Sequence, residues 1–143
     1  MGSKLDVRNW LLASAAVFIL YSLLQFIVQR VFFMPTFPEV YPASPGVQDL
    51  GLVQTYTYLG RAIFALVFVY IFTRGFEAKA GVFEGIRFGF WIALLIQVPA
   101  VFASLVVLNQ PAGILVGSAV SGTIQYILCG ILANMIYRKP KAA

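Results

Sequence analysis

The chain has 143 residues, of which 61% are hydrophobic and only 10% are charged, whereas soluble globular proteins average roughly 45–50% and about 25%; a soluble fold of this length is excluded. With no histidine and one cysteine, Cys129, the chain cannot form an internal disulfide, a CxxC redox pair or an imidazole-held metal or haem site. The basic residues that give the chain its net charge of +5 flank apolar segments. This placement indicates membrane orientation rather than nucleic-acid binding.

The first predicted element is a transmembrane helix over residues 10–31. A bilayer crossing takes about 20 helical residues, and the uncharged stretch Asn9–Gln29 alone provides 21. That length favours a retained helix over a cleaved signal peptide. The segment Met34–Asp49 follows and contains Pro35, Pro38, Pro42 and Pro45. These prolines predict a non-helical loop.

The second predicted span covers residues 52–72 and contains one charge, Arg61. The polar segment Thr73–Gly85 predicts a turn. The next 50 residues, 88–137, carry no charge, and a helix of that length cannot fit one bilayer. The turn-forming residues at 109–113 divide this stretch into spans over 87–108 and 114–137. The sequence therefore predicts a single domain over 1–143, an all-α integral membrane protein built as a four-transmembrane-helix bundle of two hairpins.

The basic residues predict the orientation of these helices. Eight of the ten lie on the side of the termini: Lys4, Arg8, Arg74, Lys79, Arg87, Arg138, Lys139 and Lys141. Because cytoplasmic flanks of membrane helices carry the excess of Lys and Arg, we expect both the N- and the C-terminus to be cytoplasmic.

Four polar side chains fall within the predicted spans: Arg61, Gln25, Gln97 and Gln125. Intramembrane charges usually face a bundle interior or a water-filled cavity, so these residues are candidates for a polar cavity or an anion site. Two structural alternatives stay open. Arg61 could extend to the outer surface and pair with Glu39 or Asp49, and the glutamines could hydrogen-bond between helices as packing contacts.

Small residues recur along one face of the fourth predicted span. They are Gly113, Gly117 and Ser121, with Ser118 and Gly122 beside them. Small residues at a spacing of four let another helix backbone approach closely. This helix-packing face could serve within the chain, in a homo-oligomer or against another membrane protein.

One tract extends across the predicted turn between the second and third spans. It covers residues 68–77, Gly81, 84–85 and 87–89. In this tract the chain resembles a group of small four-span bacterial membrane proteins of unknown function. The resemblance implies a location in the bacterial inner membrane and implies no activity.

The residues present disfavour an enzyme, because the chain offers neither a nucleophile with a base nor a cluster of metal ligands. We expect no metal and no cofactor. The first expectation is a structural or accessory subunit that packs in the membrane against a partner or a second copy, surrounded by lipids and without nucleic acid. The alternative is a small transporter, channel or lipid- or anion-binding protein that uses Arg61 and the glutamines.

Overall fold

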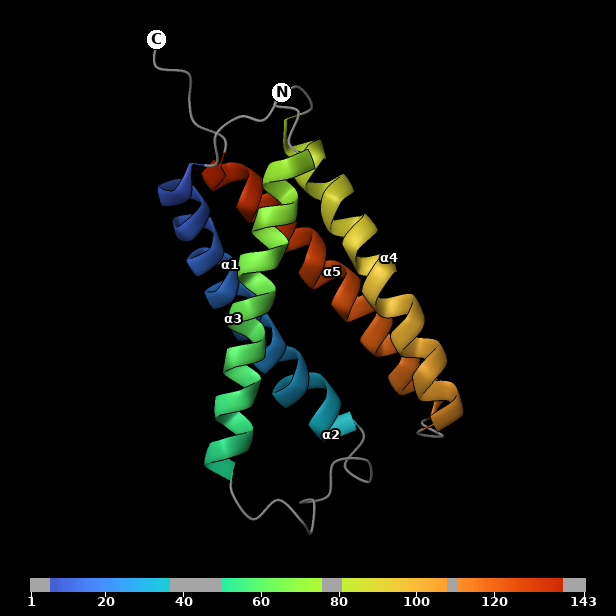
Figure 1. Ribbon diagram of the computed structural model, residues 1–143. Helices are drawn as coiled ribbons and strands as arrows, with labels where there is room; N and C mark the ends of the chain where they lie inside the picture. The colour runs from blue at the N-terminus through green and yellow to red at the C-terminus, as the bar shows by residue number, and fades with distance from the viewer. Residues whose placement is uncertain (1–5, 37–49, 76–80, 108–110, 138–143) are drawn as a thin grey trace.

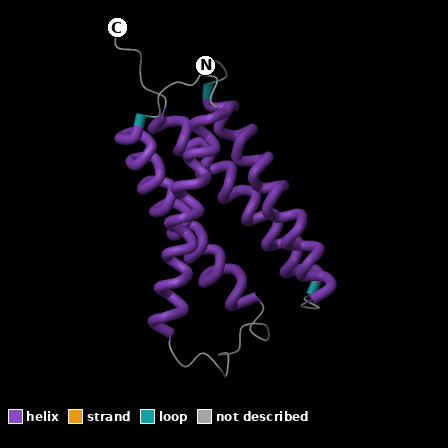
Figure 2. The backbone as a smooth tube through the Cα atoms, in the orientation of Figure 1, coloured by secondary structure: helices purple, strands orange, loops and turns teal. Residues whose placement is uncertain are grey.

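A computed structural model describes residues 6–36, 50–75, 81–107 and 111–137. These residues are almost entirely helical (Figure 2). The elements are α1 (Val7–Ile27), η1 (Val28–Phe33), α2 (Met34–Thr36), α3 (Leu50–Gly75), α4 (Val82–Val107) and α5 (Ala112–Tyr137). The element η1 is a π-helical stretch that continues directly from α1 into α2.

Four helices are long and apolar enough to cross a membrane: Val7–Thr36, Gly51–Gly75, Val82–Val106 and Ala112–Tyr137. They run alternately up and down, so that the start of α1 and the end of α5 lie at the same end of the bundle (Figure 1). This arrangement confirms the predicted all-helical bundle with four spans, and it is that of a multi-pass membrane protein.

The helices extend further than the sequence predicts. Residues 73–75 end α3 and residues 82–85 begin α4, although the sequence predicts a turn for both. The prediction of a loop from Met34 is also wrong at its start, because Met34–Thr36 is helical. Pro35 is tolerated there because the preceding π-helical bonds, including Met34 N–H to the Gln29 carbonyl, have already departed from the α pattern that a proline would break. The predicted loop and turns also include 37–49, 76–80 and 108–110, which lie outside the described residues.

Glycines bring α4 and α5 into close contact. A Cβ atom added to Gly85 would lie 2.5 Å from the Gly130 carbonyl oxygen, and one added to Gly89 would overlap the Tyr126 carbonyl oxygen. Because the backbones of the two helices meet at these points, only glycine fits. Asn134 adds a polar contact at the end of this pair, where its Nδ2 donates to the Gly81 carbonyl over 2.8 Å.

The helix α1 packs against both α3 and α5. The indole Nε1 of Trp10 donates to the Leu66 carbonyl of α3 over 3.2 Å. Apolar side chains fill the half of the bundle nearest the chain ends, and the ring of Phe68 meets that of Phe88 there at a centroid distance of 4.9 Å. The buried core consists of Ala13, Val17, Ala65, Phe68, Val69, Phe72, Ala93, Tyr126, Cys129 and Ala133.

The opposite half of the bundle is packed differently. In α3, every residue from Gly51 to Gly60 is exposed, so this part of the helix meets little of the described chain. The second half of the α1–η1–α2 span lies beside α5 and encloses two adjoining cavities with it. These cavities hold most of the polar side chains that the sequence places within the membrane.

Candidate functional site

A polar pocket of about 340 Å³ lies between α1, η1, α4 and α5. Amide and hydroxyl side chains make up most of its wall: Tyr21, Gln25, Gln29, Gln97, Ser104, Ser118, Ser121, Gln125 and Tyr126. Val28, Phe33, Ala100, Ile114 and Gly122 complete the lining. Gln125 is the fourteenth of 26 residues in α5, which places the pocket about 20 Å along that helix at 1.5 Å per residue.

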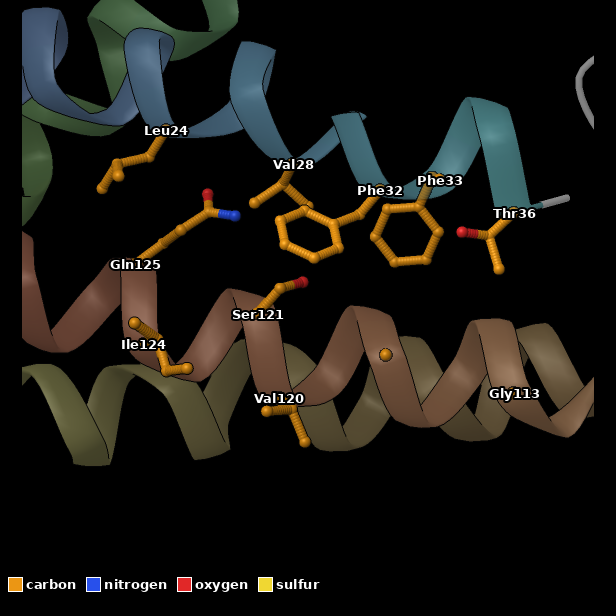
Figure 3. Close-up of a pocket in the computed structure, with 11 residues that line it drawn as sticks. Leu24, Val28, Phe32, Phe33, Thr36, Gly113, Val120, Ser121, Ile124 and Gln125 are labelled. Atoms are coloured by element: carbon orange, nitrogen blue, oxygen red, sulfur yellow. The ribbon is translucent and has the colours of Figure 1, made fainter. Parts of the chain in front are cut away.

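Gln125 is the most deeply placed of the pocket amides. Its side chain is only 4% exposed, and it points from α5 toward α1 (Figure 3). Across residues 6–36, 50–75, 81–107 and 111–137, no side chain or backbone group makes a hydrogen bond with its amide. The amide atoms are not among the fully buried unpaired atoms of the described residues, so they reach open space in the pocket. The amide is therefore available to a polar group inside the pocket.

Gln97 reaches the same pocket from α4 because Gly122 has no side chain. The Gln97 Nε2 and Cδ atoms occupy the space that a Cβ at position 122 would take. Below these amides the rings of Tyr21 and Tyr126 stack at a centroid distance of 5.9 Å and an interplanar angle of 20°. The two rings thus lie where the polar pocket meets the apolar core.

An apolar groove of about 490 Å³ adjoins the polar pocket. It lies between α1, η1 and α2 on one side and α5 on the other (Figure 3). Its walls are formed by Leu24, Val28, Phe32, Phe33, Thr36, Gly113, Gly117, Val120, Ser121, Ile124 and Gln125. Phe32 is 63% exposed and Val120 56% exposed, so the rim of the groove faces the membrane surroundings.

The groove and the pocket share four lining residues: Val28, Phe33, Ser121 and Gln125. Phe33 stands at this junction. Its ring lies against Gly117, where an added Cβ would be 3.4 Å from the ring atom Cζ. The two cavities therefore adjoin each other across these residues, with the apolar groove at the membrane side and the polar pocket in the interior.

The π-helical stretch η1 supplies four of the residues that line the two cavities, namely Val28, Gln29, Phe32 and Phe33. Such stretches contain about one residue more per turn than an α-helix, and they occur frequently at functional sites. Here the stretch lies where the chain borders both cavities. Its position therefore adds to the evidence that this region is a binding site.

Gln25, Gln97 and Gln125, which the sequence singles out, all line the polar pocket. Arg61 lines neither the pocket nor the groove. Its guanidinium carbon lies 5.3 Å from the centre of the Tyr58 ring on the same helix, at a distance typical of a cation–π contact. Glu39 and Asp49, its predicted partners, lie outside the described residues.

The small-residue face of α5 is directed toward the cavities. Gly113 and Gly117 line the groove, Ser118 and Gly122 line the pocket, and Ser121 lines both. The closest contact between helices uses another set, Gly85, Gly89 and Gly130, which the sequence analysis does not identify as a packing contact. The spacing of four between Gly85 and Gly89 is the signal that would have found this contact.

Sequence reasoning also misses Phe33 and Ser104 as lining residues, because single aromatic or hydroxyl side chains are common in membrane helices. In the part of the chain that the structure describes, no group of three or more His, Cys, Asp or Glu side chains comes together. Comparison with known protein families, with curated proteins and with solved structures finds no match for this chain.

Proposed function

We propose that this chain is an intramembrane binding protein for an amphiphile, a molecule with an apolar tail and a polar head. One observation carries the proposal, namely that the apolar groove directly adjoins the polar pocket, with Phe33, Ser121 and Gln125 lining both. A tail in the groove and a head in the pocket would each meet a surface of matching polarity. Binding sites for small molecules have volumes of roughly 300–1,000 Å³ and combine apolar walls with a few polar groups.

The clustering of four amides, Gln25, Gln29, Gln97 and Gln125, supports this proposal over a purely structural role. Interhelical hydrogen bonds between polar side chains stabilise membrane helices by about 0.6–2 kcal/mol. No such bond joins the side chains of Gln25, Gln97 and Gln125 to one another or to any other described residue. The amides therefore face a shared space instead of holding the helices together.

Filling the groove tests the proposal. The protein is extracted with its surrounding lipid into nanodiscs, and native mass spectrometry then identifies molecules that stay bound after release. Gly117→Leu places a side chain in the groove opposite Phe33, whereas Gly60→Leu places one where nothing lies within 4 Å. We expect a bound molecule with the wild type and with Gly60→Leu, and its loss with Gly117→Leu. Equal retention by both variants, or no bound molecule with any of them, would contradict the proposal.

The accessory-subunit role remains a second candidate, because one observation favours it. All ten residues from Gly51 to Gly60 of α3 are exposed, and they include the polar side chain of Gln54. A partner helix or a second copy of the chain could cover this segment. Mild extraction followed by a mass measurement tests the role, and recovery of the chain as a monomer without another protein would reject it.

The location proposed for this function is the bacterial inner membrane, with both termini on the cytoplasmic side. The orientation is supported by the distribution of basic residues, eight of ten on the side of the termini, together with the positive-inside tendency of membrane proteins. Reporter domains fused after residue 143 test the orientation. An enzyme that is active only outside the cytoplasm should stay inactive in this fusion.

A further inference from the structure

We infer that the head group bound in the polar pocket is electrically neutral and carries a hydroxyl, so that the ligand is a neutral lipid of the diacylglycerol type. The inference rests on the proposed amphiphile-binding function and narrows its ligand. Three features carry it: the absence of charge from the lining of the pocket, the hydrogen-bonding capacity of its amides, and the opening of the groove toward the membrane.

Among the described residues, the lining of the polar pocket contains no Asp, Glu, Lys or Arg. The basic residues of this half of the bundle are directed elsewhere. Arg61 lies over the Tyr58 ring and lines neither cavity, and Arg30 is exposed with its guanidinium 6.0 Å from the Phe26 ring. A phosphate or ammonium group transferred into an uncharged pocket inside the bilayer, without an opposite charge, loses far more hydration energy than it regains. A neutral head group avoids this cost.

The amides of Gln25, Gln97 and Gln125 define what the neutral head must offer. Each amide presents two N–H donors and a carbonyl acceptor, whereas the hydroxyl oxygens of Ser118 and Ser121 can only accept from a ligand. The two serine hydroxyls donate to backbone carbonyls of their own helix, to Leu115 over 2.9 Å and to Ser118 over 3.2 Å. The glutamine amides are thus the main groups of the pocket that can still form hydrogen bonds with a ligand. A hydroxyl, which both donates and accepts, complements them.

The groove sets how such a lipid reaches the pocket. Its rim residues Phe32 and Val120 are exposed to the membrane surroundings, and the path from the rim to Gln125 passes between η1 and α5 (Figure 3). A lipid can therefore move its head sideways from the bilayer into the pocket while its tail stays in apolar surroundings. A neutral head group makes this passage without the cost of desolvating a charge.

Photolabelling with two probes that differ only in the head group tests the inference. The full chain is placed in phosphatidylcholine nanodiscs with a diacylglycerol or a phosphatidate, each carrying the same diazirine-bearing acyl chain. We expect the diacylglycerol to label residues of η1 and α5 at least tenfold more strongly than the phosphatidate. We expect Gln125→Leu to lower the diacylglycerol labelling about tenfold, and Gln54→Leu, an equivalent change at an exposed glutamine of α3, to leave it unchanged.

The outcomes separate the inference from the function on which it rests. Equal or stronger labelling of η1 and α5 by the phosphatidate would overturn the neutral head group and leave amphiphile binding intact. Labelling by neither probe, or labelling that Gln125→Leu and Gln54→Leu affect equally, would overturn both. Gln25→Leu, at a half-buried position of the same pocket, provides a second variant if Gln125→Leu lowers the yield of folded protein.

Discussion

The side-chain amide of Gln97 occupies the space that the missing side chain of Gly122 leaves open on α5. In Gly122→Ala the new methyl group would displace this amide, which is the flexible end of a side chain and not a backbone atom. We therefore predict that Gly122→Ala keeps the thermal stability of the wild type and weakens labelling by the diacylglycerol probe about tenfold, which corresponds to about 1.4 kcal/mol. Thermal unfolding and photolabelling of the same preparation check both parts. Unchanged labelling would show that Gln97 does not contact the ligand.

Alanine at Gly89 should act in the opposite way. Its Cβ would overlap the Tyr126 carbonyl oxygen and approach the Cα of Ile127, so the backbones of α4 and α5 must separate. Overpacking of this kind costs about 1–3 kcal/mol. We predict that Gly89→Ala lowers the free energy of unfolding in mixed micelles by this amount.

Gly60→Ala is the matched control for Gly89→Ala, because nothing lies within 4 Å of an added Cβ there. Alanine in a helix interior is favoured over glycine by about 0.5–1 kcal/mol. The control should therefore be neutral or slightly stabilising. Equal loss of stability in both variants would mean that the effect does not come from the contact between α4 and α5.

The prediction for Arg61 follows from its place outside both cavities. Arg61→Leu should leave ligand labelling unchanged, because the guanidinium lies over Tyr58 and does not reach the pocket. Photolabelling of the wild type, Arg61→Leu and Gln125→Leu in parallel measures this. If Arg61→Leu lowers labelling as much as Gln125→Leu, Arg61 lies on the route of the ligand.

Asn134 should contribute to stability and not to binding. It is 1% exposed, and its Nδ2 donates to the carbonyl of Gly81, where the positive φ of 62° begins the turn into α4. Asn134→Ala removes this hydrogen bond and leaves the Gly81 carbonyl with the weaker bond from the Glu84 N–H, at 3.3 Å. We therefore predict a loss of about 0.5–1.5 kcal/mol in the free energy of unfolding. Thr123→Val is the control on the same helix, because the Thr123 hydroxyl bonds only to the Ala119 carbonyl one turn away. It should change stability by less than about 0.5 kcal/mol.

The sequence predicts the four helices well, because long uncharged runs between polar turns can only be membrane spans. It does not predict which helices touch. In a membrane the lipid-facing residues are as apolar as the core, so periodicity could not show that α3 packs on α1 and leaves Arg61 away from the pocket. It also gives no sign of η1, since π-helical bonding depends on how the chain packs and not on a recognisable residue pattern. The grouping of Gln25, Gln97 and Gln125 is easier to predict from the sequence, because their positions along the spans place them at similar depths in the membrane.

The π-helical stretch also fixes the rotational phase of everything that follows it in the first span. An α-helix turns about 100° per residue, and a π-helical turn takes in roughly one residue more than an α-helical turn. Without that extra residue, the side chains after Val28 would be rotated by about a quarter-turn around the helix axis. Phe33 would then no longer face Gly117. The junction between the groove and the pocket thus depends on the number of residues in one turn of helix as much as on which residues these are.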